Sequence, residues 1–164
     1  GMSFVDFAHL KERNIKNGIL DYNRQKTGTP MRLEILDTAE LMRKELMGDK
    51  KPASGYLFPF LSGTKTGYEA YLEYNAALSR FNRNLKALKK AAGIASDVTS
   101  YTIRHSFAMA LKEQNVPIEM ISELLGHKSI KTTQIYLRSF SLEKMTEVNS
   151  TCFGCVYNYV SKVG

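Results

Sequence analysis

Tryptophan is absent from this chain of 164 residues, which also has only two cysteines and four prolines. The cysteines, Cys152 and Cys155, form a single Cys-x-x-Cys near the C-terminus. Tetrahedral zinc needs two further ligands, and no nearby His or Cys pair supplies them. The strand and helix of a thioredoxin-like redox site are not indicated either. We therefore interpret both cysteines as reduced thiols of an intracellular protein.

Long apolar runs are also missing. No stretch approaches the ~20 apolar residues of a membrane-spanning helix, and the first residues do not resemble a signal peptide. We therefore expect no membrane partner. Because the chain opens Gly-Met-Ser and not with methionine, we also expect a processed or excised segment with further sequence upstream.

The remaining composition is that of one soluble globular domain. Hydrophobic residues make up 43% and charged residues 24% of the chain, and its 164 residues are enough to bury a core without disulfides or metals. Lysine and arginine outnumber aspartate and glutamate by 23 to 16, which gives a net charge of +7. This charge favours a polyanionic partner, although alone it is only modest support for nucleic acid.

Apolar periodicity predicts a mainly α-helical α+β fold with a small β-hairpin or three-stranded sheet. The predicted strands are 19–23 and 31–36, with a turn at 26–30 between them, and a short strand at 56–58; Asn17-Gly18 marks a further turn. The predicted helices are 3–13, 37–47, 68–92, 100–114, 117–125, one that Ser129 caps and that carries Tyr136, and a short one at 142–148. We expect no internal boundary, so residues 1–164 form one domain.

The predicted helix 68–92 has two different faces. One is an apolar stripe of Leu78, Phe81, Leu85, Leu88 and Ala92. The other positions carry cations and no acid: Arg80, Arg83, Lys86, Lys89 and Lys90. Two interpretations stay open, namely a solvated surface and a face that contacts nucleic-acid phosphates.

Arg104, His127 and Tyr136 together indicate phosphoryl chemistry. They lie in the runs Thr-Ile-Arg-His-Ser, Leu-Leu-Gly-His-Lys and Thr-Gln-Ile-Tyr-Leu. A guanidinium binds two phosphate oxygens at once, an imidazole donates to developing charge, and a phenolate is a nucleophile. Each residue alone would be interpreted as surface charge or half-buried core, so the indication comes from the ordered set.

The ordered set resembles the catalytic domain of the tyrosine recombinase (phage integrase) family. The run 104–108, Arg-His-Ser-Phe-Ala, is similar to the family's Arg-His-Thr-Phe-Ala; 125–127 is similar to its Leu-Gly-His, and Tyr136 follows nine residues after His127, as in the family. The resemblance covers nearly the whole chain and includes integrases of Bacteroides-type mobile elements. It implies a DNA breaking–rejoining fold and the integration or excision of mobile DNA by site-specific recombination.

The resemblance also implies a mechanism without metal or nucleotide cofactor. Tyr136 attacks the scissile phosphate to form a 3′-phosphotyrosyl intermediate, and Arg104 and His127 stabilise the transition state. Lys26, at the tip of the predicted hairpin, protonates the leaving 5′ oxygen. We interpret His105 as structural packing.

Two positions depart from the family pattern. Tyr101 stands where the family has the histidine of His-x-x-Arg, and a phenol is a poor base near neutral pH. The run 1–10 resembles the family's Gly-Leu-Arg-x-x-Glu-Leu box, which puts Ser3 at the first catalytic arginine and Asp6 at the acidic position. Because serine carries no charge, we expect this chain alone to cleave DNA weakly or not at all. Some integrases of Bacteroides-type mobile elements carry an arginine directly before such a glycine, and an arginine at that position would lie outside this sequence.

The implied partners are double-stranded DNA and further copies of the chain, as a tetramer on DNA. The tail 139–164 is apolar enough to dock onto a neighbouring protomer, and folding back onto its own domain is an equal alternative. Family members also carry an N-terminal DNA-binding domain, which this chain lacks, so we expect weak and salt-dependent DNA binding. The implied location is the bacterial cytoplasm.

Two other functions stay open. A type IB topoisomerase-like enzyme would use the same chemistry to relax supercoils. A non-catalytic DNA-binding module would use 104–114 and 117–125 as a helix-turn-helix, although Glu119 and Glu123 suit a packed helix better than a helix in a DNA groove.

Overall fold

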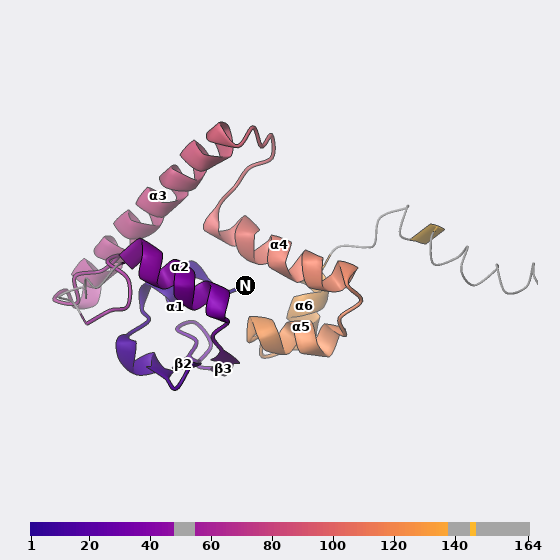
Figure 1. The fold of residues 1–164 in the computed structure, drawn as a ribbon, viewed down its shortest axis with the longest axis horizontal. Helices are drawn as coiled ribbons and strands as arrows, with labels where there is room; N and C mark the ends of the chain where they lie inside the picture. The colour runs from indigo at the N-terminus through magenta and orange to yellow at the C-terminus, as the bar shows by residue number, and fades with distance from the viewer. Residues whose placement is uncertain (48–54, 138–144, 147–164) are drawn as a thin grey trace, which may run out of the picture.

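Six α-helices and a three-stranded antiparallel sheet make up residues 1–47, 55–137 and 145–146, the part of the chain that the computed structural model describes (Figure 1). The strands are β1 (Ile15–Lys16), β2 (Ile19–Asn23) and β3 (Pro30–Glu34), in that order across the sheet. The helices are α1 (Phe4–Ala8), α2 (Asp37–Met47), α3 (Gly67–Ala91), α4 (Ser100–Glu113), α5 (Ile118–Leu125) and α6 (Ile130–Tyr136). The predicted mainly helical α+β fold is therefore confirmed.

The sheet contains the predicted hairpin and one strand that was not predicted. In the hairpin of β2 and β3, Tyr22 pairs with Met31. Asn17 and Gly18 have positive φ angles of 52° and 74°, as a two-residue type I′ turn requires, and this turn pairs β1 with β2. The turn was predicted from the sequence, whereas the short strand before it was not.

Two predicted elements are wrong in detail. The strand expected at 56–58 is not formed, because only Tyr56 makes an isolated bridge, to Lys11. The helix expected over 3–13 ends at Ala8. The chain turns there into a 3₁₀ helix at Glu12–Asn14 (η1), since the Asn14 side chain accepts from the Lys11 amide (2.9 Å) and donates to the Asp21 carbonyl (2.9 Å). Side-chain bonds of this kind compete with a continuing helix.

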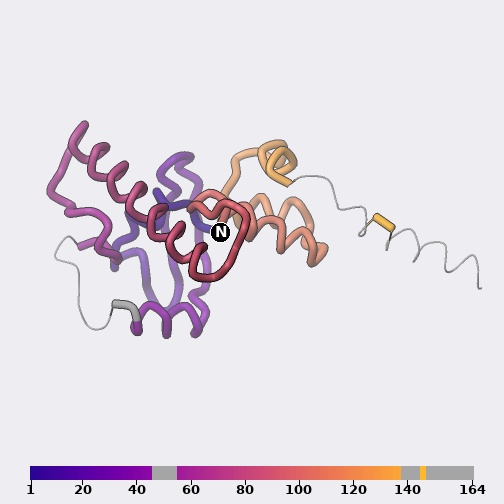
Figure 2. Tube along the Cα trace, turned by 90° about the horizontal axis from the view of Figure 1, so that it is seen from above, coloured from indigo at the N-terminus to yellow at the C-terminus, as the bar shows by residue number. Residues whose placement is uncertain are grey.

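Buried apolar residues form three clusters. The first joins α1 to α3 and the loop before it through Phe4, Ala8, Leu61 and Ala77. The second lies under the hairpin and contains Leu10, Tyr22, Met31 and Leu57. The third joins α4 to α5 through Ala108, Ile121 and Leu125. The helices α4, α5 and α6 gather at one end of the molecule, and the C-terminal end of α5 meets the hairpin (Figure 2).

The apolar stripe predicted on α3 is only partly buried. Leu78, Phe81 and Leu85 are partly buried, whereas Leu88 is 65% exposed and Ala92, just past the helix, is exposed too. The last turns of α3 extend past the neighbouring elements, which leaves this part of the stripe without a packing surface (Figure 1). Although α3 has 25 residues, no helix in the described part of the chain is apolar enough to cross a membrane.

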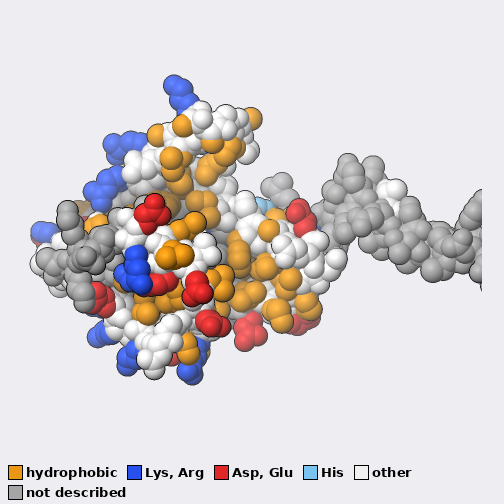
Figure 3. All heavy atoms as spheres, in the orientation of Figure 1, with side chains coloured by type: hydrophobic (Ala, Val, Ile, Leu, Met, Phe, Trp, Pro, Cys, Tyr) orange, Lys and Arg blue, Asp and Glu red, His pale blue; other side chains and the backbone are white. Residues whose placement is uncertain are grey.

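The cations of α3 lie along its outer edge (Figure 3). Arg80, Arg83, Lys86 and Lys90 are exposed, while Lys89 donates to Asp97 at 3.1 Å. Both earlier interpretations require exposed cations, so contact with nucleic acid stays a prediction. The predicted helix 142–148, the tail 139–164 and both cysteines lie outside the described residues, apart from residues 145 and 146, which are helical.

Candidate active site

The start of α4 is fixed by a reciprocal cap. The Thr99 side chain accepts from the Thr102 amide (3.2 Å), and the Thr102 side chain accepts from the Thr99 amide (2.7 Å). The Asn82 side chain of α3 accepts from the Ser100 amide (2.9 Å), which ties the two helices together. A capping box of this type fixes the direction in which a helix begins, so the next turn holds Arg104 in a set position.

The end of α5 determines where His127 lies. Gly126 has a φ of 61°, and its amide and that of His127 donate to the carbonyls of Glu123 (2.8 Å) and Ser122 (3.0 Å). This is the Schellman pattern, which reverses the chain after a helix. A Cβ on residue 126 would lie 2.5 Å from Arg24 Cδ, so glycine is required here for its conformation and for its size. The helix predicted over 117–125 therefore ends at the predicted residue.

Arg104 and His127 are in direct contact. The Arg104 guanidinium, which is 7% exposed, donates to the carbonyls of Gly1 and Leu125, and its Nη2 lies 3.4 Å from His127 Nε2. On its other side, His127 Nδ1 is 2.9 Å from Thr133 Oγ1 on α6. Burial, followed by the charges of Arg104 and Arg24, lowers the pKa of His127 to about 4. The imidazole is therefore neutral at pH 7.

Tyr136 lies among the rings of the other site residues. Its ring centroid is 5.4 Å from Tyr101, 5.2 Å from His105 and 5.7 Å from His127, each nearly edge-on. Its hydroxyl is buried without a hydrogen-bond partner among the described residues. Burial, and next the neighbouring phenol of Tyr101, raise the pKa of Tyr136 to about 12. The phenol is therefore protonated and enclosed.

Tyr101 and His105 both lie on the side of α4 that faces Tyr136. Residues four apart share a face of a helix, which explains why one tyrosine contacts both. Tyr101 is 62% exposed, so the ring that packs against Tyr136 also reaches solvent. His105 packs as predicted, but the residue it packs against is the candidate nucleophile itself.

The hairpin turn brings a different residue to the site from the one predicted. Lys26 lies in the turn between β2 and β3, as expected, and is exposed. Arg24, two residues earlier, is 7% exposed, and its Nη1 donates to the Gly126 carbonyl at 2.7 Å. Its Nε donates to Asp6 Oδ2 at 3.2 Å. Arg24 was not among the site residues predicted from the sequence.

Asp6 organises this side of the site. Its carboxylate is nearly fully buried and accepts from the Ser3 hydroxyl (2.5 Å), from Arg24 Nε and, through Oδ1, from the Gln25 amide (2.7 Å). Asp6, at the predicted acidic position, therefore attaches the hairpin turn to α1. Ser3 caps α1 and brings no charge.

Positive charge is in excess at the site. Burial and then the charge of Arg24 lower the pKa of Arg104, because two guanidiniums share a region with one carboxylate, Asp6. With His127 neutral, these three charged side chains leave a surplus of one positive charge. Such a surplus in a partly buried site favours a bound anion.

Comparison with known protein families identifies the class. The model of the phage integrase family matches residues 4–143, which is most of the chain and includes Arg104, His127 and Tyr136. The chain belongs to the phage integrase family.

Curated relatives of this integrase-family chain are tyrosine recombinases. It is 52% identical over 54 residues to the XerD recombinase of Lacticaseibacillus casei, a stretch that covers 33% of this chain and 18% of that protein. It is 41% identical over 75 residues to XerC of Rickettsia typhi, which covers 46% of this chain and 24% of that protein. The chain thus matches less than a quarter of each relative's length.

Solved structures of integrase-family proteins have the same fold. The crystal structure of XerA recombinase superposes with a TM-score of 0.64 at 22% identity, covering 90% of this chain and 50% of that one. The Tn1549 transposon integrase in complex with circular intermediate DNA gives 0.63 at 16% identity, covering 90% and 54%. Identities this low establish the fold alone.

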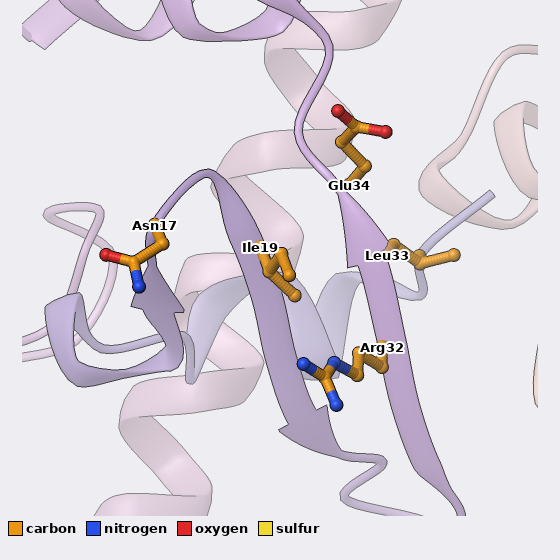
Figure 4. Close-up of a pocket in the computed structure, with 5 residues that line it drawn as sticks. All are labelled: Asn17, Ile19, Arg32, Leu33 and Glu34. Carbon is orange, nitrogen blue, oxygen red and sulfur yellow. The ribbon is translucent and has the colours of Figure 1, made fainter.

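A separate hollow lies on the sheet. It has a volume of about 360 Å³ and is lined by Asn17, Ile19, Arg32, Leu33 and Glu34, none of which belongs to the candidate active site (Figure 4). Arg32 extends from β3 across the sheet and is exposed. It is therefore a hairpin arginine that differs from Arg24 in both burial and position.

The neutral state of His127 predicts a pH-dependent stability. Its pKa of about 4 in the folded chain lies below the usual 6.5, so the unfolded chain binds a proton first as the pH falls. The stabilising contribution is complete above pH 6.5 and is lost as the pH falls towards 4. Between pH 7.5 and 5, urea unfolding should show a larger loss of stability for the wild type than for His127→Gln.

His9→Gln is the matched control for this prediction, because His9 lies outside the Arg104 cluster: its Nδ1 is 2.8 Å from the Val5 carbonyl oxygen, and its ring contacts Tyr56 and Tyr74. It should lose as much stability as the wild type over the same pH range. Equal losses in the wild type and His127→Gln would show that the fold does not hold the imidazole neutral.

Proposed function

We propose that this chain is the catalytic domain of a site-specific tyrosine recombinase that integrates or excises mobile DNA. The observation that carries this proposal is the cluster in which Arg104 contacts His127 and both lie at Tyr136. A fixed cation, an imidazole and a phenol at one anion-attracting site match the needs of phosphoryl transfer to tyrosine.

The proposed cleavage step conserves the phosphoester bond. Tyr136 Oη bonds to the scissile phosphorus, the bond from phosphorus to the 5′ oxygen breaks, and a 3′-phosphotyrosyl link results. The phenol loses its proton, and the departing 5′ oxygen gains one from Lys26. The 5′ hydroxyl of a second strand then attacks phosphorus and releases Tyr136, so strands are exchanged without an external energy source. Arg104 and His127 stabilise the charge that develops on the non-bridging oxygens.

Tyr101 stands in the position of the family's histidine, and we do not assign it as a base. Its ring contacts Tyr136 and is exposed, so we assign its hydroxyl the role of passing the proton of Tyr136 to water once Tyr136 leaves its buried position. A neutral phenol does not take up a further proton near neutral pH. The closed position of Tyr136 is therefore a resting state, and its hydroxyl must move towards the phosphate before attack.

Replacing the proposed acid should slow cleavage on normal DNA only. Lys26→Gln is expected to reduce the cleavage rate about 10²-fold, because general acids contribute at least this much to such a step. A 5′-bridging phosphorothiolate substrate releases a thiolate, which needs no proton, and should restore the rate. Lys16→Gln, in strand β1 of the same sheet, is the control and should cleave both substrates normally. A Lys26→Gln defect of equal size on both substrates would exclude the acid role.

The finer assignments also belong to this proposal. The sequence resemblance supports an integrase of a Bacteroides-type mobile element that acts on double-stranded DNA in the bacterial cytoplasm. It also supports a tetramer joined through the tail 139–164 and an N-terminal DNA-binding domain outside this chain. The exposed cations Arg80, Arg83, Lys86 and Lys90 on α3 are a suitable phosphate-contacting edge.

Covalent capture of DNA tests the proposal. Selection of bound duplexes from a random pool, with a non-cleaving Tyr136→Phe chain at low salt, provides the DNA site. A nicked version of this site traps the cleaved strand, so the wild type should form an adduct that survives denaturing electrophoresis. Specific binding without any adduct would reject recombinase chemistry and leave a DNA-binding module.

The alternatives predict different products. A topoisomerase-like enzyme would relax a supercoiled plasmid without producing recombinant joints. The helix-turn-helix alternative is disfavoured by the exposed surface of α5, which presents the carboxylates of Glu119 and Glu123. Acidic side chains there would repel DNA phosphates, whereas a recognition helix needs groups that reach base edges.

A further inference from the structure

The first turn of α1 lacks a cation that the chemistry needs. Ser3 occupies the position of the family's first arginine, and its hydroxyl is already engaged, as the cap of α1 and as a donor to Asp6 at 2.5 Å. A transition state that spreads negative charge over two non-bridging oxygens is poorly balanced by Arg104 alone. A second positive group has to come from elsewhere.

Arg24 reaches the same place from the hairpin. Arg104 donates to the Leu125 carbonyl and Arg24 donates to the next carbonyl, that of Gly126. Two guanidiniums therefore hold consecutive peptide groups immediately before His127. The influence of Arg24 on the pKa values of both Arg104 and His127, which it lowers, agrees with this proximity.

Arg24 is also held in a fixed orientation. Its Nε donates to Asp6 and its Nη1 donates to the Gly126 carbonyl. Because Asp6 is one carboxylate beside two guanidiniums, one positive charge in this partly buried region has no counter-ion, and an anion bound at Arg104 would supply it. Since Asp6 also binds the Gln25 amide, its carboxylate fixes both the side chain and the backbone of this turn.

We propose that Arg24 is the second guanidinium that binds the scissile phosphate, in place of the arginine that Ser3 replaces. Asp6 is its positioning residue. This inference rests on the proposed recombinase function and changes one expectation from the sequence, because the chain then contains both halves of the phosphate clamp. A purely structural Arg24 would instead only link the hairpin to the end of α5.

Substitution of one phosphate oxygen distinguishes phosphate binding by Arg24 from a purely structural link between the hairpin and α5. The selected DNA site is prepared with a normal scissile phosphate and with a methylphosphonate, in which a neutral methyl group replaces one non-bridging oxygen. Arg24→Gln should reduce the cleavage rate on the normal phosphate about 10²–10³-fold. On the methylphosphonate, Arg24→Gln and the wild type should cleave at similar rates, since there is less charge to bind. The ratio of the two rates does not depend on how much of a variant is folded.

Arg32→Gln is the matched control, because Arg32 is an exposed arginine on the same hairpin. It should behave like the wild type on both substrates. Arg24→Lys keeps the charge and should fall between the wild type and Arg24→Gln in its rate ratio. An Arg24→Gln defect of the same size on both substrates would overturn the inference in favour of a structural link.

A binding measurement keeps this test independent of cleavage. In the Tyr136→Phe background, Arg24→Gln should weaken binding to the normal site and leave binding to the methylphosphonate site unchanged. An equal loss of affinity for both sites would contradict phosphate contact by Arg24. If the wild type forms no adducts but this difference in binding is still observed, the result contradicts the recombinase proposal and leaves phosphate contact by Arg24 supported.

Discussion

Tyr136→Phe is expected to abolish the covalent protein–DNA adduct completely, while the chain folds and binds its DNA site at least as well as before. The hydroxyl is the proposed nucleophile, and no other group can replace its oxygen in the phosphotyrosyl bond. The same hydroxyl is buried without a hydrogen-bond partner among the described residues, so its removal eliminates a desolvated polar group and leaves the ring contacts intact. Stability should therefore be unchanged or slightly higher.

Tyr101→Phe is the control, because it removes a neighbouring hydroxyl on an exposed ring. It should retain adduct formation at a reduced rate. Adducts are measured on the nicked site by denaturing electrophoresis, and stability by urea unfolding. Persistent adducts in Tyr136→Phe would mean that another side chain is the nucleophile, and Tyr101 would be the first residue to examine.

Helices and turns whose ends are set by residues close together in the sequence were predicted with nearly correct bounds. Asp37–Met47 forms the helix expected at 37–47, and Ser129 caps α6 by accepting from the Lys131 amide (3.3 Å). Helix caps and Asn-Gly turns involve residues only a few positions apart, so the sequence itself contains the information. The strand expected at 56–58 depended on pairing with a distant segment, and there the prediction failed.

Arg24 shows why the site was only partly predictable. In the sequence it is an ordinary basic residue just after a strand, two positions before Lys26, the residue that was predicted to be the acid. Its role depends on the Gly126 carbonyl, 102 positions away, and on Asp6, 18 positions away. Only the folded chain shows that the side chain is buried against the end of α5. The useful signal was the missing charge at Ser3, which required a second cation without indicating its source.

Tyr101 and His105 provide the opposite case. Their spacing places both on one face of α4, so the sequence was sufficient to predict that they share an environment. Which residue they share it with was not predictable, because that depends on where the turn after α5 places the end of α6. The structure places Tyr136 against that face of α4, so two ordinary helix positions are neighbours of the proposed nucleophile.

Gly126→Ala should lose more stability than an alanine at the other glycines with positive φ whose added Cβ would meet no atom within 4 Å, which are Gly18, Gly28, Gly55, Gly67 and Gly93. A Cβ there would lie 2.5 Å from Arg24 Cδ and 2.6 Å from Met31 Sδ, in a residue with a φ of 61°. The left-handed conformation costs about 1 kcal/mol for alanine, and forcing two packed side chains apart costs roughly 2 kcal/mol more. We expect a loss of about 3 kcal/mol in urea unfolding, by addition of these two terms.

Gly93→Ala separates the two causes. Gly93 follows α3 with a φ of 66°, yet a Cβ there would have no atom within 4 Å, so only the conformational cost of about 1 kcal/mol applies. Gly126→Ala should also lose cleavage in the folded fraction, because the displaced Arg24 releases the Gly126 carbonyl that precedes His127. Equal stability losses in the two variants would show that the hairpin does not press against the end of α5, and that would remove the structural basis for assigning Arg24 to the active site.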